Sequence, residues 1–308
     1  MGDKMINDKF EKLFGEPTRK PELDKLKQFH MDVAASIQIV IEKIILKITN
    51  YISETYECEN LCLAGGVALN CVANSKILSQ SKFKNIWIQP AAGDAGGAIG
   101  AALSIWHQKL KNSRIISDED KMNGSFLGPS FDSKTIKSIL LEINAKFREY
   151  KDAEIIRKTA NLLSDGKIIG WFQGRMEFGP RALGGRSIIA DPRSEKMQSE
   201  LNLKIKFRES FRPFAPSILE SEKSKWFELD QDSPYMLLVS NVKKEKRLTL
   251  NNNDRKLEGM DQLNLKRSVV PAITHVDYSA RVQTVNNKTN PKYFNLLNEF
   301  YKITGCPI

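Results

Sequence analysis

The clearest pattern in the chain is a run of apolar residues at every third or fourth position between residues 21 and 56. No glycine or proline interrupts this segment after Pro21, so the spacing predicts one long amphipathic helix. Two short apolar runs follow at residues 60–64 and 85–89, and both are typical of buried strands. Further helices are predicted from the Gly65-Gly66 turn to about residue 78 and from residue 95 to about residue 111. This order of strand, helix, strand and helix predicts a layered α/β domain.

The second half of the chain shows the same alternation. We expect helices at residues 133–142, 153–164 and 194–206, and strands at residues 167–172, 214–219 and 235–239. A strand over residues 203–208 is an alternative to the third helix, because Lys204, Lys206 and Arg208 would then share one face.

Two polar segments divide this pattern. The charged stretch 111–124 is the predicted linker, which gives domains at residues 1–115 and 125–308. The Asn-rich stretch 243–268 is expected to be a mobile excursion. A chain of 308 residues with 41% hydrophobic content is long and apolar enough for two packed cores.

The net charge of +10 favours anionic partners such as phosphorylated metabolites or nucleic acid. The basic residues are mixed with acidic ones, as in residues 243–247, and no basic–aromatic stripe is visible, which argues against nucleic acid. The polar start of the sequence and the lack of a long apolar run predict a cytoplasmic protein without a membrane segment.

The four cysteines are expected to be reduced and mostly buried thiols. Cys58 and Cys62 lie four residues apart, but no second close pair accompanies them and the three histidines are scattered. This spacing argues against a zinc site.

Arginines and glycines are concentrated in residues 170–187, and two further arginines follow in residues 208–216. The planar fork of arginine matches the geometry of phosphate and carboxylate, and glycine lets backbone N–H groups approach the same anion. The segment therefore predicts a site for a phosphorylated ligand. The alternative is a solvated basic loop with structural turns.

Two glycine turns in the first domain lie where a strand passes into a helix. The Gly65-Gly66 turn presents free N–H groups at a helix start, which suits a phosphate. In the second turn, Asp94 is either a metal ligand or a helix cap. The glycines of this turn fit neither a dinucleotide-binding fingerprint nor a Walker-type loop, and a Gly-x-Ser-x-Gly elbow is absent.

A last polar cluster occupies residues 274–284. His275 and Asp277 would share one face of a strand, and Arg281 and Gln283 would share a face in the same way. This density of hydrogen-bonding side chains predicts at least one contact to a ligand, although a lone histidine is commonly structural.

These segments together resemble the carbamoyltransferase family of antibiotic and nodulation-factor O-carbamoylation enzymes. The matching phrases are Gly-Gly-Val-Ala-Leu-Asn at 65–70, Gln-Pro-Ala-Ala-Gly-Asp-Ala-Gly-Gly-Ala-Ile-Gly-Ala-Ala at 89–102, Gly-Arg-Met-Glu-Phe-Gly-Pro-Arg-Ala-Leu-Gly-Gly-Arg-Ser-Ile at 174–188, Arg-Glu-Ser-Phe-Arg-Pro-Phe-Ala-Pro at 208–216 and His-Val-Asp-Tyr-Ser-Ala-Arg-Val-Gln-Thr at 275–284. The resemblance covers residues 26 to 308.

The resemblance implies an α/β protein with part of an actin-like transfer domain followed by a YrdC-like domain. The YrdC-like domain would form carbamoyl-adenylate from carbamoyl phosphate and ATP with Mg²⁺, and the first domain would pass the carbamoyl group to a hydroxyl of a small-molecule or saccharide acceptor near a divalent metal, usually iron. The implied roles are catalytic for Arg181, Arg186 and His275, carbamoyl phosphate and ATP binding for Arg175, Arg208, Arg212, Asp277 and Arg281, nucleotide binding for Gly65, Gly66 and Asn70, and metal binding for Asp94.

Two departures from the family pattern imply a fragment cut at both ends. The family has a His-x3-His metal pair, but only His30 precedes Asp94 here, and the sequence stops at Ile308, before a strand that the family continues into. We therefore expect this chain alone to fall short of the complete transfer reaction. The alternative functions are an RNA-binding module related to tRNA modification and a non-catalytic remnant of a split gene.

Overall fold

The computed structural model describes residues 6–20, 22–117 and 119–308. The chain divides into two compact units, Met1–Lys43 and Ile44–Ile308. Helix α1 (Asp8–Phe14) lies in the first unit, and helix α2 (Gln28–Tyr56) begins in the first unit and ends in the second. The long predicted helix is therefore confirmed over residues 28–56. Its predicted start at Pro21 lies outside the described residues, and the prediction was wrong for residues 22–27, which are not helical.

The first part of the second unit confirms the predicted order of strand, helix, strand and helix. Strand β1 (Asn60–Leu63) pairs in parallel with β2 (Asn85–Ile88), helix α3 (Cys71–Gln80) connects them, and α4 (Gly96–Ser104) follows. A 3-10 turn (Gly66–Leu69) precedes α3, and Asn70 caps α3 by accepting a hydrogen bond from the backbone N of Ala73. Helix α4 continues as a single π-helical turn (Ile105–Lys109).

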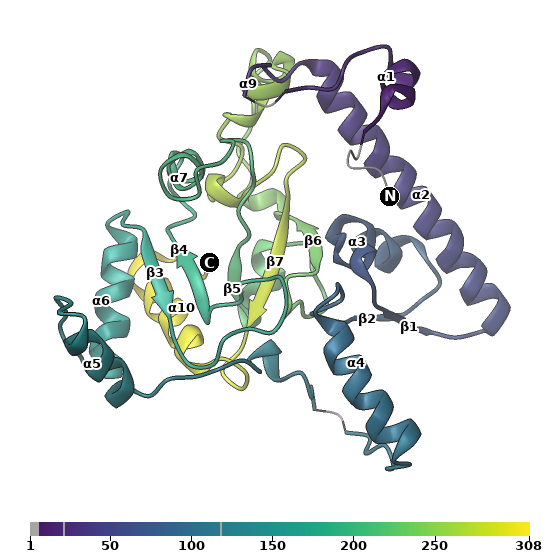
Figure 1. Cartoon of the computed structure of the whole chain (residues 1–308). Helices are drawn as coiled ribbons and strands as arrows, with labels where there is room; N and C mark the ends of the chain where they lie inside the picture. The colour runs from purple at the N-terminus through teal and green to yellow at the C-terminus, as the bar shows by residue number, and fades with distance from the viewer. Residues whose placement is uncertain (1–5, 21, 118) are drawn as a thin grey trace. The chain divides into compact units, whose positions relative to one another are not determined.

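Two small sheets organise the rest of this unit (Figure 1). Strand β3 (Ile169–Phe172) pairs antiparallel with β4 (Arg186–Ile189), and β7 (Ser279–Val285) lies between β5 (Ser217–Leu219) and β6 (Leu238–Asn241), parallel to β5 and antiparallel to β6. The helices are α5 (Ser133–Glu142), α6 (Asp152–Ser164), α7 (Met197–Glu200), α8 (Lys223–Trp226), α9 (Gly259–Leu263) and α10 (Pro291–Thr304). Helix α10 packs along α6.

One continuous hydrophobic core joins the three-stranded sheet to α10. Phe227, Ile218, Val282 and Leu296 are at most 1% exposed. Helix α3 packs on the same sheet, because the side-chain amide of Asn74 donates to the carbonyl oxygen of Leu237 over 3.1 Å. The segments on either side of the predicted linker therefore share one compact unit. None of the helices in the described part of the chain is long and apolar enough to cross a membrane.

Several predicted element boundaries were wrong for local reasons. The predicted helix 194–206 is shorter, because only Met197–Glu200 is α-helical before a π-helical turn, and the alternative strand at 203–208 does not form. The strand predicted at 214–219 starts only at Ser217, after Pro216, whose ring cannot donate to a sheet. The strand predicted at 235–239 starts at Leu238, because Met236 has a φ of 56° that extended backbone does not allow.

The prediction that His275 and Asp277 lie on a strand was also wrong. Residues 275–278 form a turn in which the backbone N of Tyr278 donates to the carbonyl oxygen of His275 over 3.0 Å. Tyr278 has a φ of 66°, and β7 begins at the next residue. Arg281 and Gln283 do lie on β7, as predicted.

The polar segment 243–268 folds back on itself. Its backbone bonds connect Leu248 N to Arg267 O and Val269 N to Lys246 O. The segment carries a short 3-10 turn (Asp254–Lys256) and α9 between these bonds, so it is an excursion whose two ends are held side by side.

The cysteines differ from the prediction that most of them are buried. Cys306 is 2% exposed, but Cys71 is half-buried and Cys58 and Cys62 are exposed. Burial raises the pKa of the Cys306 thiol to about 11.

A thiol-labelling experiment at pH 8 should separate these environments. Cys58 and Cys62 are expected to react rapidly with a disulfide reagent, because the reactive thiolate is accessible at both sites, while Cys306 reacts only after unfolding. Quenched labelling followed by peptide mass spectrometry measures each rate. Labelling of Cys306 in the folded protein as fast as of Cys58 would contradict the burial described here.

Candidate functional site

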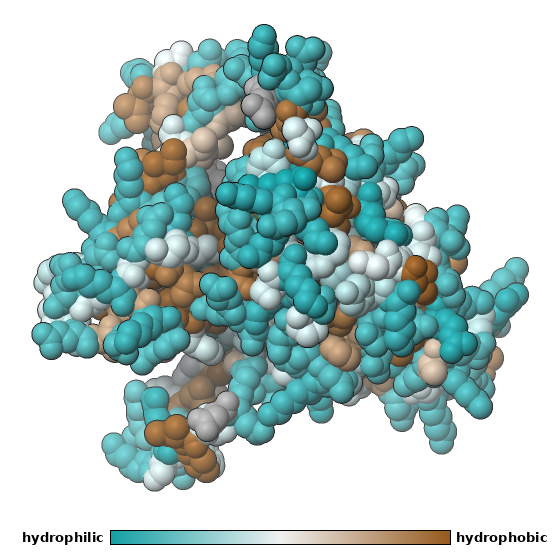
Figure 2. Space-filling view, turned by 180° about the vertical axis from the view of Figure 1, so that it is seen from behind, coloured by the Kyte–Doolittle hydropathy of each residue, from teal (hydrophilic) through white to brown (hydrophobic). Residues whose placement is uncertain are grey.

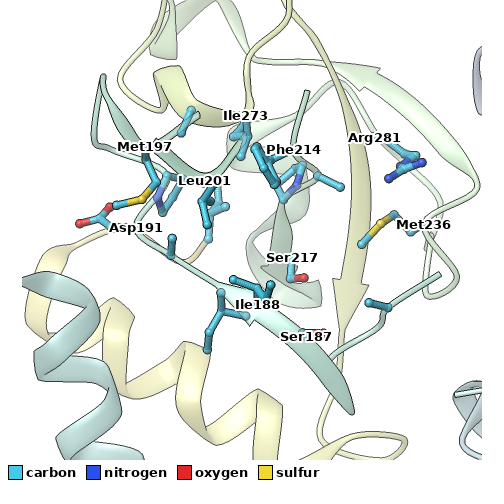
Figure 3. A pocket seen from close by; sticks show the side chains of 18 of the residues that line it. Ser187, Ile188, Asp191, Met197, Leu201, Phe214, Ser217, Met236, Ile273 and Arg281 are labelled. Atoms are coloured by element: carbon cyan, nitrogen blue, oxygen red, sulfur yellow. The ribbon is translucent and has the colours of Figure 1, made fainter. Parts of the chain in front are cut away.

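A cavity of about 390 Å³ lies in the second unit, within the range of roughly 300–1,000 Å³ that is usual for small-molecule sites. Its walls come from β4, the segment 206–217, β7 and α10. Figure 3 shows Arg281 at one end of the cavity, with Met197, Leu201 and Ile273 gathered at the other. The cavity therefore has a cationic end and a largely apolar end, where the Asp191 carboxylate also lies and pairs with Arg193.

Three arginines form the cationic end. Arg181, Arg208 and Arg281 all line the cavity, although they come from three separate segments of the chain. No Asp or Glu within the described ranges forms an ion pair with any of them. Burial lowers the pKa of Arg281, and the charges of Arg181 and Arg208 lower it further. Like charges gathered at one cavity repel one another, which favours the binding of an anion there.

Two of the arginines are held in place by neutral groups. Arg181 Nη2 donates to the carbonyl oxygen of Leu69 over 3.1 Å, and Arg208 Nε donates to Oδ1 of Asn202 over 2.6 Å. The Cys71 side chain lies near Arg281 and opposes the lowering of the Arg281 pKa. These contacts orient the guanidinium groups without neutralising them, so the charge remains available to a ligand.

Two guanidinium nitrogens of this cluster lack a partner. Nε of Arg181 and Nε of Arg281 are buried, and neither has a hydrogen-bond partner among the residues that the structure describes. A buried donor without a partner costs about 1–3 kcal/mol. Two such donors at one cavity therefore indicate a site built for acceptor oxygens of a ligand.

Glu177 shapes the loop that carries Arg181. Its side chain is only 6% exposed, and its Oε1 accepts backbone N–H bonds from Leu183 and Gly185 at 2.7 Å and from Arg186 at 3.2 Å. One carboxylate oxygen thus holds three backbone N–H groups within residues 183–186. Glu177 was not predicted as a functional residue, although its place inside the arginine–glycine segment was a usable signal.

Arg186 lies in the same phrase but is turned away from the cavity. Its guanidinium stacks 3.4 Å from the ring centroid of Phe172 and donates to the carbonyl oxygens of Gln173, Gly185 and Gly174. Arg186 therefore braces the β3–β4 hairpin in this structure.

The remaining predicted anion-binding arginines also lie outside the cavity lining. Arg175 is exposed and donates to the carbonyl oxygen of Gly128 over 3.0 Å. Arg212 pairs with Glu209 at 2.9 Å on the surface. The structure thus brings together Arg181, Arg208 and Arg281 and separates them from Arg175, Arg186 and Arg212.

His275 and Asp277 lie beside this cluster rather than in the cavity wall. Nε2 of His275 is buried without a hydrogen-bond partner in the described part of the chain. Burial lowers the pKa of His275 below its ordinary 6.5, Asp277 opposes this shift, and Arg281 and Arg267 add to it. The folded protein therefore keeps His275 neutral, while Asp277 is exposed and accepts a hydrogen bond from the backbone N of Ser279.

The lowered pKa of His275 predicts a pH dependence of folding. The unfolded chain protonates this imidazole at a higher pH than the folded chain does, so the stability that its neutral form provides is present above pH 6.5 and is lost as the pH falls through the folded pKa. Urea titrations of the wild type and His275→Gln between pH 7.5 and 5.5 measure this contribution. The wild type should lose more stability on acidification than the variant, and equal losses would contradict the prediction.

The two glycine turns of the first half approach the arginine segment. Gly65 N donates to the carbonyl oxygen of Ala92 over 2.8 Å, which joins one turn to the other. A Cβ on Gly179 would lie 3.1 Å from the carbonyl oxygen of Pro90. Gly65 and Gly66 are exposed and Asn70 is half-buried, and none of the three belongs to the cavity lining.

Asp94 is exposed at the start of α4. Among the described residues, no group of three or more His, Cys, Asp or Glu side chains is placed to hold a metal ion. A transition-metal site needs several protein ligands, so the surroundings of Asp94 do not fit one.

Several residues that line the cavity were not predicted from the sequence. Tyr293, Ser217 and Met236 are part of its wall, and the Ser217 hydroxyl donates to Oε1 of Gln283 over 2.7 Å. Burial raises the pKa of the Tyr293 phenol. The helical spacing of residues 291–304 predicts a packed helix but does not show that one of its aromatic residues reaches a site.

A mixed α/β unit with an arginine-lined cavity defines a protein with a candidate site for a small anionic ligand. Comparisons with known proteins extend this description. The model of the carbamoyltransferase N-terminus matches residues 1–103, and that of the carbamoyltransferase C-terminus matches residues 160–308. The chain belongs to the carbamoyltransferase family, as the sequence resemblance implied.

Individual relatives support the family assignment. The chain is 57% identical to an uncharacterised protein of Synechocystis sp. over 99% of this chain and 50% of the relative. It is 39% identical to the nodulation protein NolO of Bradyrhizobium diazoefficiens, over 91% of this chain and 48% of the relative. Nodulation protein U of Azorhizobium caulinodans is 36% identical over 81% and 38%, respectively. The chain thus spans about half the length, or less, of these relatives.

Proposed function

We propose that the arginine-lined cavity binds carbamoyl phosphate and ATP in an O-carbamoyltransferase. The observation that carries this proposal is the convergence of Arg181, Arg208 and Arg281 on one cavity with two unpartnered Nε donors. Carbamoyl phosphate and the ATP triphosphate both present several anionic oxygens, which arginine forks bind in a fixed orientation.

The chemistry of the proposed reaction fits the charge of the site. Carbamoyl phosphate, ATP and one water would give carbamoyl-adenylate, phosphate and pyrophosphate. The carbamoyl carbon would then pass to a hydroxyl oxygen of a small-molecule or saccharide acceptor, with AMP leaving. Fixed guanidinium groups offset the charge of two polyanions brought together and hold their reacting groups in line. The apolar end around Met197 and Ile273 gives the base of ATP a water-poor surface.

The two family-model matches support a finer division of the chain. We assign residues 1–115 to part of an actin-like transfer domain and residues 125–308 to a YrdC-like domain that forms carbamoyl-adenylate, because the N-terminal and C-terminal family models fall on these two parts. In this proposal Gly65, Gly66 and Asn70 contact nucleotide in the transfer domain. Mg²⁺ would enter with ATP. Since the described residues around Asp94 do not fit a metal centre, we derive no step through iron.

The proposed activation step is testable on the full chain. We expect release of pyrophosphate from ATP that depends on added carbamoyl phosphate, measured with a coupled pyrophosphate assay. Arg212→Ala, a surface arginine paired with Glu209, serves as the matched control and should retain the activity that Arg181→Ala loses. Pyrophosphate release that is the same with and without carbamoyl phosphate, or equal in the two variants, would refute the proposal.

A further inference from the structure

We propose that Gln283 is a positioning residue, which sets the spacing of the three cavity arginines without contacting their ligand. The inference rests on the proposed anion site and deepens it, because it names the residue that connects the parts of that site. Gln283 lies on β7 and is 4% exposed. It does not belong to the described cavity lining, so it acts on the site through its neighbours.

A buried carboxamide in this core requires an explanation. Figure 2 shows a face covered mainly by hydrophilic residues, whereas the core around β7 contains apolar residues such as Val282 and Ile218. Moving an amide into such a core is unfavourable unless its polar atoms are hydrogen-bonded. Both polar atoms of the Gln283 side chain are bonded, at 2.7 and 2.9 Å. A satisfied polar group in a core restricts its neighbours to one arrangement.

Gln283 links the loop of Arg181 to the strand of Arg281. Its Nε2 donates to the carbonyl oxygen of Leu183 over 2.9 Å, and Leu183 follows Arg181 by two residues. Gln283 in turn follows Arg281 by two residues on β7, so their side chains lie on the same face of the strand. Two residues span at most about 7 Å of chain. This one hydrogen bond therefore ties the backbones that carry the two arginines closely together.

Gln283 also holds the segment that carries Arg208. Its Oε1 accepts from the Ser217 hydroxyl over 2.7 Å, and its backbone N donates to the carbonyl oxygen of Pro216 over 2.9 Å. Pro216 and Ser217 end the segment 206–217, which forms one wall of the cavity. Near the other end of this segment, Arg208 Nε donates to Asn202 over 2.6 Å. One buried residue thus connects all three segments that supply the arginines.

Other groups keep the loop at Leu183 folded without Gln283. The carbonyl oxygen of Leu183 also accepts from Nδ2 of Asn290 over 3.3 Å, and its backbone N donates to Oε1 of Glu177 over 2.7 Å. Replacing Gln283 therefore leaves both backbone groups of Leu183 with a partner. The link to β7 is lost, because Asn290 lies at the N-terminus of α10. We expect a folded protein whose arginines are less well aligned.

Calorimetric titration with carbamoyl phosphate tests the inference. Gln283→Met keeps the length of the side chain but removes its polar atoms. It should weaken binding by about 10-fold, because hydrogen bonds weaken steeply away from their preferred geometry although the charges remain.

Thr284→Val is the matched control. Thr284 is buried at the next position of β7, and its hydroxyl accepts from the backbone N of Ser233 over 2.9 Å. Its side chain lies on the opposite face of the strand from Gln283. Urea unfolding should show similar losses of stability in the two variants, whereas Thr284→Val should change the affinity less than about twofold.

A double-mutant cycle separates positioning from a general weakening of the core. If Gln283 acts by aligning Arg281 with Arg181, Gln283→Met should cost less than about threefold in a chain that already carries Arg281→Ala. An equal fold-loss in both backgrounds would overturn the inference. Gln283→Asn, which keeps the carboxamide on a shorter side chain, is the second variant if Gln283→Met does not fold, and it should lose about threefold.

The same titrations distinguish failure of the inference from failure of the anion site. If Arg281→Ala loses affinity but Gln283→Met and Gln283→Asn bind as the wild type does, the anion site stands and the positioning role is wrong. If the wild type does not bind carbamoyl phosphate, or Arg281→Ala binds it equally well, the anion site is wrong and the positioning role is wrong with it.

Discussion

Replacing Arg281 by alanine should weaken the binding of carbamoyl phosphate by about 100-fold, which corresponds to about 2.7 kcal/mol. Arg281 lines the cavity from β7, and its Nε is buried without a partner in the described structure. The substitution removes a charge-assisted donor from a site that excludes much of the water, so solvent cannot replace it. Arg281→Lys keeps the charge but loses the fork, and we expect an intermediate loss of about 10-fold.

Two controls separate this effect from misfolding. Arg212→Ala removes a surface arginine already paired with Glu209 and should change the affinity less than about twofold. Arg281→Ala also relieves the repulsion from Arg181 and Arg208, so its melting temperature should equal or exceed that of the wild type. Calorimetric titration of the wild type and the three variants measures the affinities. Equal affinity of Arg281→Ala and Arg212→Ala would show that the cavity is not the anion site.

The second large effect should come from Gly184→Ala, which we expect to destabilise the protein by about 3 kcal/mol. Gly184 has a φ of 100°, which side chains rarely adopt, and a Cβ built on it would clash with the ring of Tyr293. That ring is 5% exposed and packs in the core through α10, so it cannot move aside cheaply.

Gly174→Ala is the matched control for this prediction. Gly174 also has a positive φ, 54°, but no atom lies within 4 Å of its added Cβ. Its substitution should cost only about 1 kcal/mol, from backbone strain alone. Urea unfolding compares the two variants, and equal costs would mean that the Tyr293 contact does not constrain this turn.

The sequence predicted the elements better than their boundaries. The uninterrupted spacing of residues 28–56 and the short apolar strands gave the correct types, because amphipathic periodicity follows directly from burial. The predicted boundaries of these elements were wrong where a single residue adopts an unusual backbone angle. Met236 and Tyr278 both have positive φ values, at 56° and 66°, and nothing in their residue types predicts this.

The candidate site was only partly predictable for a related reason. Arginine-rich phrases indicated an anion site, but they could not tell which guanidinium faces inward. Arg181 and Arg186 stand five residues apart in one phrase, and yet one lines the cavity while the other stacks on Phe172. The two guanidinium groups have different neighbours in the folded chain. Arg181 donates to the carbonyl oxygen of Leu69, which is far away in the sequence, whereas Arg186 stacks on Phe172 of the adjacent strand. The catalytic and binding roles of these residues remain predictions.

The most direct test of the proposed anion site measures the Nε–H groups of Arg181 and Arg281 during ligand binding. Proton–nitrogen NMR spectra of the arginine side chains can record the Nε–H signals of Arg181, Arg281 and Arg186 during a titration with carbamoyl phosphate. We predict that the Arg181 and Arg281 signals shift and become protected from exchange with water as one equivalent binds, while the Arg186 signal stays in place. Saturation without any change at Arg181 and Arg281, or equal changes at all three arginines, would contradict the claim that this cavity is the anion site.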